Sequence, residues 1–94
     1  MSYKLTFHPK ALKEWEGLDK SIREQFKKKL IERMENPKVE KDKLSGYDAI
    51  YKIKLRNAGF RLAYHVDDGK IVILVLVIAK RENDRAYELL KNRV

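Results

Sequence analysis

The sequence has no cysteine, and it contains only two histidines, two prolines and four glycines among 94 residues. Without cysteine, the chain cannot form a disulfide framework, a thiolate metal site or a thiol nucleophile. Its histidines, His8 and His65, stand far apart in the sequence, so no local histidine motif for a metal is present. We therefore expect neither a metal nor another cofactor, and we expect His8, which precedes a proline, to serve as a local helix cap or surface residue.

Long hydrophobic runs are also missing. The longest, residues 71–79, has nine residues, whereas a membrane-spanning helix needs ~20. The N-terminus alternates apolar and polar residues and lacks the apolar core of a secretion signal. These absences predict a cytoplasmic protein. Binding to a membrane surface is the weakest option, because neither long helix pairs a broad apolar face with a mainly basic one. The length predicts one domain over residues 1–94, with a core too modest for a large substrate cavity.

Acidic residues are fewer than basic ones, 14 against 22, which gives a net charge of +8 and a pI of about 9.7. Such an excess on a small domain favours a polyanionic partner, either nucleic acid or an anionic membrane. A charged, solvated surface is the plainer interpretation. The two halves of the chain carry equal net charge, so any cationic patch must be assembled by folding.

Hydrophobic periodicity predicts the elements of the fold. Alternation predicts strands at residues 3–7, 50–56 and 60–66, and the apolar run predicts a central strand at residues 71–79. Helical spacing predicts a hairpin of two helices before residue 36, with Leu12 and Trp15 on the core face of the first. A short helix is expected over residues 84–93. The order β-α-α-β-β-β-α predicts an α+β fold with a mostly antiparallel four-stranded sheet.

Basic residues recur at every second position of the strand at residues 50–56. Because alternate side chains point to opposite faces, Lys52, Lys54 and Arg56 are expected to share the face away from the core. Across the turn at residues 57–59, Arg61 and His65 join that face. Neither strand places an acidic residue there. Like charges at this spacing repel one another, although lysines also deter aggregation at sheet edges.

Two further features favour nucleic acid as the partner. Lys80 and Arg81 follow the apolar strand directly, and Tyr87 lies six residues after Arg81. Cations beside an aromatic ring suit a ligand that carries both phosphates and bases. The residues alone leave open whether this surface only binds nucleic acid or also cleaves it.

Four stretches together resemble the RelE toxins of the RelE/ParE toxin–antitoxin superfamily, over nearly the whole chain. They are residues 11–15, residues 23–30, residues 51–64 with the basic strand, and residues 80–87. The resemblance implies a RelE-like fold and an endoribonuclease of the mRNA interferase class. Such a toxin cuts mRNA in the ribosomal A site and inhibits translation. The attacking group is the RNA 2′-hydroxyl and no metal is needed. The implied partners are the ribosome, mRNA and a RelB-like antitoxin.

The resemblance also implies roles for five residues. Lys52 and Lys54 would activate the 2′-hydroxyl and hold charge at the phosphate. Arg61 would stabilise the transition-state phosphate, Arg81 would serve the leaving 5′-oxygen, and Tyr87 would stack on a codon base. Further contacts to RNA or the ribosome are expected from six basic residues, namely Lys41, Lys43, Arg56, Lys80, Lys27 and Lys28.

Acid–base chemistry is consistent with these roles. A free lysine, with a pKa near ~10.4, is too basic to accept protons well at neutral pH. Crowding among like charges lowers that pKa, so clustered lysines can supply a base. Arginine is a poor proton donor, which favours an electrostatic role for Arg61 and Arg81. His65 is an alternative acid or base. Ser45 stands where related toxins often carry another basic residue, and Lys41 and Lys43 lie close enough in sequence to compensate.

Two alternatives remain from the sequence. A ParE-like toxin would share the fold and inhibit DNA gyrase without cleaving RNA. A non-catalytic RNA- or ribosome-binding module would bind in a salt-sensitive way without strand scission.

Overall fold

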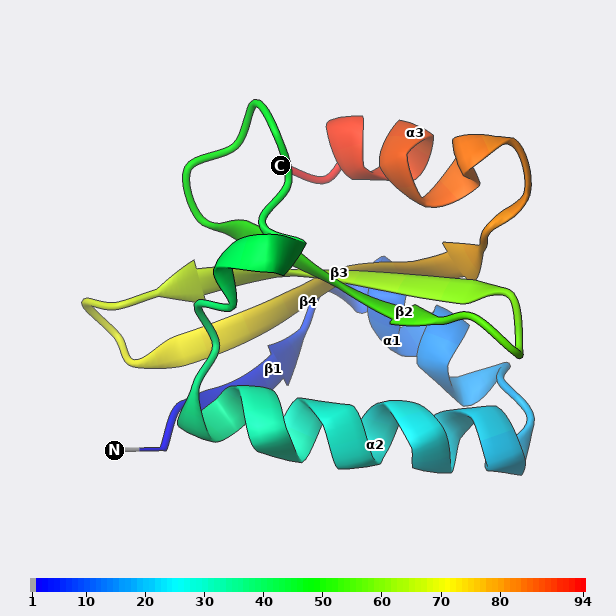
Figure 1. The fold of residues 1–94 in the computed structure, drawn as a ribbon, viewed down its shortest axis with the longest axis horizontal. Helices are drawn as coiled ribbons and strands as arrows, with labels where there is room; N and C mark the ends of the chain where they lie inside the picture. The colour runs from blue at the N-terminus through cyan, green and yellow to red at the C-terminus, as the bar shows by residue number, and fades with distance from the viewer. Residues whose placement is uncertain (1) are drawn as a thin grey trace.

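The structure, a computed structural model, describes residues 2–94 apart from the side chain of Asn83 (Figure 1). Its elements are, in order, β1 (Lys4–Phe7), α1 (Pro9–Glu16), α2 (Lys20–Glu35), the 3-10 helix η1 (Glu40–Asp42), β2 (Ile50–Leu55), β3 (Phe60–Asp67), β4 (Val72–Lys80), the 3-10 helix η2 (Glu82–Asp84) and α3 (Arg85–Lys91). The predicted order of helices and strands is confirmed, and the two 3-10 turns are additional. His8 caps α1, because its Nδ1 accepts a hydrogen bond from the Lys10 amide at 3.1 Å.

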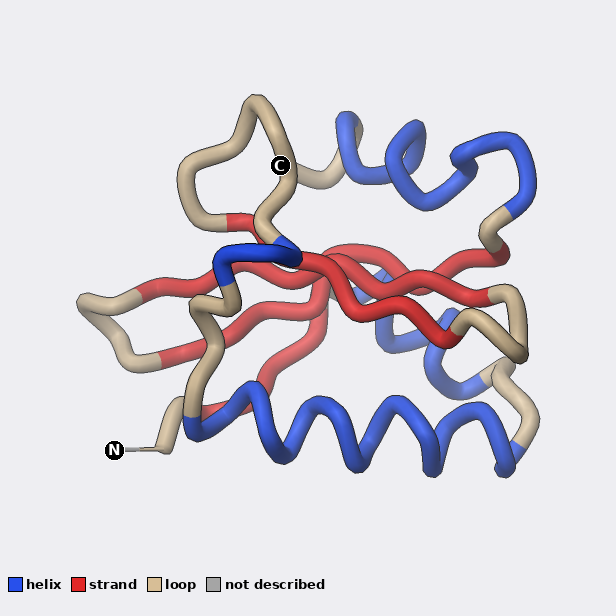
Figure 2. Tube along the Cα trace, viewed as in Figure 1, coloured by secondary structure: helices blue, strands red, loops and turns tan. Residues whose placement is uncertain are grey.

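The four strands form one mixed sheet in the order β1-β4-β3-β2 (Figure 2). β2, β3 and β4 pair antiparallel, and β1 pairs with β4 in parallel. The apolar strand β4 is central, as its lack of a polar face predicts, because helices cover both of its faces. Leu76 is the extra residue of a bulge in β4, since Ala63 pairs with Val77 while Tyr64 pairs with Val75.

Helices lie on opposite faces of this sheet. Figure 1 shows α2 below the sheet and α3 above it. The larger core lies between the sheet and the first two helices, where Phe26 and Leu30 of α2 are buried. A smaller core lies under α3, where Ala86 and Leu90 pack against Ala63. Burial of these apolar faces provides the main stabilisation of the fold.

The predicted core face of α1 is partly wrong. Leu12 is 42% exposed, whereas Ala11 is fully buried and Trp15 packs against Phe7 with ring centroids 5.3 Å apart. The helix is rotated so that Glu14, and not Leu12, faces the sheet, because the Glu14 carboxylate accepts a hydrogen bond from the β4 backbone at Ile78. A carboxylate on the packed face is a departure from simple amphipathic spacing.

The irregular stretch at residues 36–49 passes along the β2 edge of the sheet, from the end of α2 to the layer that holds α3 (Figure 1). Arg33 of α2 holds this stretch in place through hydrogen bonds. The guanidinium donates to Asp42 at 2.6 Å, to the Tyr64 hydroxyl at 2.8 Å and to the Lys52 carbonyl at 3.1 Å. The Tyr64 hydroxyl in turn donates to the Pro37 carbonyl at 2.7 Å. One cation therefore joins a helix, the stretch at residues 36–49 and both strands of the β2–β3 hairpin.

Candidate functional site

The β2–β3 hairpin brings three of the predicted cations together. Lys54 pairs directly with Arg61 across the two strands, and Lys52 pairs with Ala63. Since directly opposed residues share a face, all three cations lie on the face that carries Ala63 and α3. Gly59 closes the hairpin with a φ of 70°, in the left-handed region where glycine is favoured, and its N–H donates to the Leu55 carbonyl at 2.8 Å. The predicted placement of Lys52, Lys54 and Arg61 on one face is confirmed.

Arg61 is largely sheltered from solvent, with a side chain 16% exposed. Its guanidinium lies 5.0 Å from the centre of the Tyr87 ring, a cation–π arrangement that joins β3 to α3. Its Nη1 donates to Asp84 Oδ1 at 3.3 Å. Its Nε is buried and has no hydrogen-bond partner within the described part of the chain. The guanidinium therefore contacts an exposed carboxylate, which an incoming anion can displace, and the face of an aromatic ring.

The like charges around Lys54 change its acid–base behaviour. The positive charge of Lys52 is the largest cause lowering the Lys54 pKa below its ordinary value. Loss of hydration, the charges of Arg61 and Arg56, and a hydrogen bond with Lys52 act in the same direction. A larger fraction of Lys54 is therefore neutral near pH 7, and free to accept a proton, than in an isolated lysine, as the sequence predicts.

A second cationic area lies at the adjoining end of the sheet. Arg56, Lys80 and Arg81 are exposed and line a groove of about 520 Å³ with the turn at residues 57–59. The Arg81 N–H donates to the Gly59 carbonyl at 2.8 Å, which ties the end of β4 to the hairpin turn. β2 ends at Leu55, so the predicted strand is one residue too long and Arg56 belongs to the turn, where it lines the same groove as Arg81.

The remaining predicted cations divide between two regions. Lys41 lines a groove of about 740 Å³ with Lys54 and Arg56, between α2 and the edge strand β2. Lys43 is exposed beside β2, where its backbone pairs with Tyr51. In contrast, Lys27 and Lys28 are exposed on α2, in the layer across the sheet from α3. They do not join the surface that holds Lys52, Lys54 and Arg61.

Two residues mentioned in the sequence analysis lie outside this cluster. His65 is half-buried on the same face as Arg61, but it pairs with Ile50 and Leu74, four residues along β3. That separation is about 13 Å along a strand. Ser45 is exposed in the stretch that leads to β2, next to Gly46. Neither contributes to the Lys54–Arg61 pair.

Sequence reasoning missed two residues of the site. Arg33 stands one helical turn after Leu30, on the apolar stripe of α2, and a cation on such a stripe is a signal for a buried ion pair. Asp84 gave no comparable signal. Its contact with Arg61 depends on η2, which begins two residues after β4 ends and precedes α3.

Known proteins resemble this chain closely. A family model described as the ParE toxin of the type II toxin–antitoxin system parDE matches residues 5–85. The mRNA interferase toxin RelE of Escherichia coli K12 is 47% identical over 94 residues, which make up 100% of this chain and 99% of that protein. The solved structure of a double variant of E. coli RelE in the free state has a TM-score of 0.92 at 46% identity, covering 100% of this chain and 99% of that one.

The chain therefore belongs to the RelE/ParE family of toxins of type II toxin–antitoxin systems. Within that family it is of the RelE type, as the sequence predicts. The toxin chain of the intact E. coli RelBE toxin–antitoxin complex matches it with a TM-score of 0.84 at 49% identity, covering 87% of this chain and 100% of that one. Within residues 2–94, no helix is long and apolar enough to cross a membrane.

Proposed function

We propose that this protein is a ribosome-dependent mRNA interferase, an endoribonuclease toxin that cuts mRNA in the ribosomal A site and thereby inhibits translation. The observation that carries the proposal is the cross-strand pair Lys54–Arg61, with Lys52 beside Lys54 and the Tyr87 ring under Arg61. The cluster combines a lysine with a lowered pKa, an arginine whose buried Nε has no hydrogen-bond partner within residues 2–94, and an aromatic ring. The lysine can act as a general base, the arginine as a phosphate ligand and the ring as a surface on which a nucleobase stacks.

The proposed reaction is transfer of the scissile phosphate to the neighbouring ribose oxygen. Neutral Lys54 accepts the 2′-hydroxyl proton as the 2′-oxygen bonds to phosphorus, and the bond from phosphorus to the 5′-oxygen breaks. The products are a 2′,3′-cyclic phosphate and a 5′-hydroxyl end, which takes its proton from water. Lys52 and Arg61 stabilise the extra negative charge on the phosphate, and Arg81 stabilises the leaving oxygen.

Dependence on the ribosome follows from what this set of side chains lacks. Arginine does not release protons at neutral pH, so the cluster offers a base but no good acid. A substrate held in line for attack lowers the barrier without that acid, and a ribosome-bound codon provides such alignment. We assign RNA contacts to the basic residues along β2 and at the hairpin-turn end of the sheet, which are Lys41, Lys43, Arg56 and Lys80. To Lys27 and Lys28, which lie on the other side of the sheet, we assign contacts with the ribosome itself.

The partner that we propose for control is a RelB-like antitoxin with an acidic, amphipathic segment. Support comes from the E. coli relative, whose toxin is seen in a RelBE complex, and from the net charge of +8 on this chain. The toxin would act in the cytoplasm, where translating ribosomes are, and as a single domain over residues 1–94.

The deciding experiment adds the purified protein to bacterial ribosomes translating a defined mRNA and maps the new RNA ends. We expect cuts within A-site codons, with 2′,3′-cyclic phosphate ends. The same protein is assayed for DNA gyrase supercoiling, because the family model is described as a ParE toxin. Intact mRNA together with inhibited gyrase would establish the ParE-like alternative. Salt-sensitive binding with neither effect would indicate a non-catalytic module.

The rate of cleavage is predicted to rise with pH until Lys54 is largely neutral. In Lys52→Gln, the largest cause that lowers the Lys54 pKa is removed. The Lys54 pKa then moves up, so the rising limb of the pH–rate profile moves to higher pH and the rate at neutral pH falls. Single-turnover rates across pH test this. Arg56→Gln, which removes a weaker cause, is expected to move the limb in the same direction by less; an unmoved limb in both variants would contradict Lys54 as the base.

Asp84 is predicted to compete with the RNA phosphate for Arg61, because its carboxylate already contacts the Arg61 guanidinium. The Asp84 side chain is 74% exposed, and pairs of that kind contribute little. In Asp84→Asn we therefore expect a KM lower by roughly two- to fivefold with an unchanged kcat. Glu88→Gln is the matched control, since it removes the same charge from α3. An equal fall in KM in both variants would show an effect of net charge alone.

A further inference from the structure

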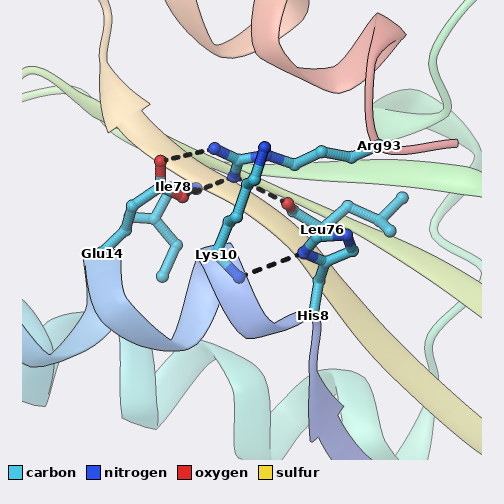
Figure 3. Close-up of polar contacts among 6 residues, drawn as sticks. All are labelled: His8, Lys10, Glu14, Leu76, Ile78 and Arg93. Carbon is cyan, nitrogen blue, oxygen red and sulfur yellow. Dashed lines mark hydrogen bonds and ion pairs between the residues drawn. The ribbon is translucent and has the colours of Figure 1, made fainter.

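The C-terminal end of the chain is tied to α1 by a charged pair that lies outside the cationic site (Figure 3). Arg93 Nη1 and Nη2 donate to Glu14 Oε1 and Oε2 at 2.7 and 3.0 Å. The Arg93 side chain is 7% exposed and that of Glu14 is 25% exposed. A planar guanidinium that meets a carboxylate with two parallel bonds, sheltered from water, fixes the position of both partners.

The same pair completes the hydrogen bonding of β4. β1 pairs only with Val72–Val75, so the later part of β4 has no strand beside it on that side within the described chain. There, the Ile78 N–H donates to Glu14 Oε1 at 3.1 Å, and Arg93 Nη1 donates to the Leu76 carbonyl at 3.0 Å. Buried backbone groups must find partners. Glu14 and Arg93 therefore replace the missing strand, and they do so at the bulge.

The helix between this pair and the cationic site depends on such anchors. α3 has seven residues and buries only Ala86 and Leu90. A helix this short is not stable by itself in water. Its beginning is held mainly by the contact of the Tyr87 ring with Arg61, because the Asp84 contact with Arg61 is exposed and weak. Its end is held by Arg93, whose backbone N–H bonds to the Leu90 carbonyl and whose side chain reaches α1 and β4.

We propose that the Glu14–Arg93 pair is a positioning element for RNA cleavage: it holds α3 on the sheet, and so keeps the Tyr87 ring under Arg61. Neither residue touches the RNA or the reacting atoms, so both act through α3. The inference rests on the role proposed above for Tyr87. It adds a role in catalysis to a pair that already satisfies the backbone of β4 at Leu76 and Ile78.

The test is a kinetic double-mutant cycle on ribosome-bound mRNA. Arg93→Gln is expected to lower kcat roughly tenfold, a change typical of coupled residues, with KM altered less than twofold. In a Tyr87→Ala background the same substitution is expected to change kcat by less than about twofold, because the ring that it positions is gone. Glu14→Gln is the second variant, and it is expected to lower kcat by less than Arg93→Gln because it keeps an acceptor for the Ile78 N–H. Lys91→Ala, an exposed cation at the end of α3, is the matched control.

Hydrogen exchange of the folded variants provides a measurement that does not depend on activity. In Arg93→Gln, the amides of residues 87–90 should exchange faster while those of β3 keep their wild-type rates. In Arg93→Lys, the exchange rates of these amides should lie between those of the wild type and those of Arg93→Gln, since a lysine can reach the Leu76 carbonyl but cannot form both bonds to the carboxylate. An equal loss of kcat in both backgrounds, or unchanged exchange in α3, would overturn the proposal. Wild-type cleavage by Tyr87→Ala gives a different result: it refutes the role proposed for Tyr87, whatever the exchange of α3 shows.

Discussion

Replacing Arg61 by alanine is expected to lower the rate of A-site cleavage by ~10²–10³-fold, the usual effect of removing one transition-state donor. Arg61 is the cation that we assign to the phosphate, because it pairs with Lys54 across the hairpin and its guanidinium is held over the Tyr87 ring. Its charge acts in a sheltered position, where electrostatic stabilisation is stronger than in water. The measurement is the single-turnover rate at saturating ribosome–mRNA complex.

Two further variants make this result specific. Arg61→Lys keeps the charge but loses the planar fork and its stacking on Tyr87, so we expect it to recover only a small part of the rate. Lys70→Ala removes a cation from the exposed β3–β4 turn, three residues after the end of β3, and should cleave like the wild type. A loss of less than threefold in Arg61→Ala, with normal folding, would rule out Arg61 as the main phosphate ligand.

The parts of the site that the sequence predicted correctly are those governed by local geometry. Alternation along a strand decides which side chains share a face, so Lys52 and Lys54 could be placed from the order of residues alone. A short turn then fixes the register of the partner strand, which adds Arg61. The apolar run of β4 also predicted its central place, because two covered faces leave no polar positions.

The parts that the sequence did not predict depend on contacts between distant segments. Arg33 reaches Tyr64 and Lys52, and Glu14 reaches Arg93, 79 positions later. No periodicity links such pairs. The rotation of α1 that exposes Leu12 has the same origin, because Glu14 occupies the packed face to meet β4. Helical periodicity thus gave wrong or incomplete predictions at charged residues that lie on otherwise apolar helix faces.

Substitution of Arg33 by alanine is expected to lower the free energy of unfolding by about 2–4 kcal/mol, the largest stability effect that we predict. The variant leaves the Asp42 carboxylate without its 2.6 Å partner and the Lys52 carbonyl and Tyr64 hydroxyl without their donor. The side chains of Arg33 and Asp42 are only 13% and 20% exposed, so water replaces these bonds poorly. For a domain of this size the melting temperature should fall by roughly 10–25 °C.

The stability of two companion variants separates the loss of the network from the loss of helical charge. Glu24→Ala, at an exposed position of the same helix, should stay within about 0.5 kcal/mol of the wild type. The double variant Arg33→Ala with Asp42→Ala should be more stable than Arg33→Ala alone, because it no longer contains a part-buried carboxylate without a partner. Urea unfolding followed by circular dichroism measures all of them, and an Arg33→Ala midpoint equal to that of Glu24→Ala would contradict the prediction. Because Arg33 also holds the backbone of Lys52, the Arg33→Ala protein, assayed where it is still folded, should cleave more slowly than Glu24→Ala.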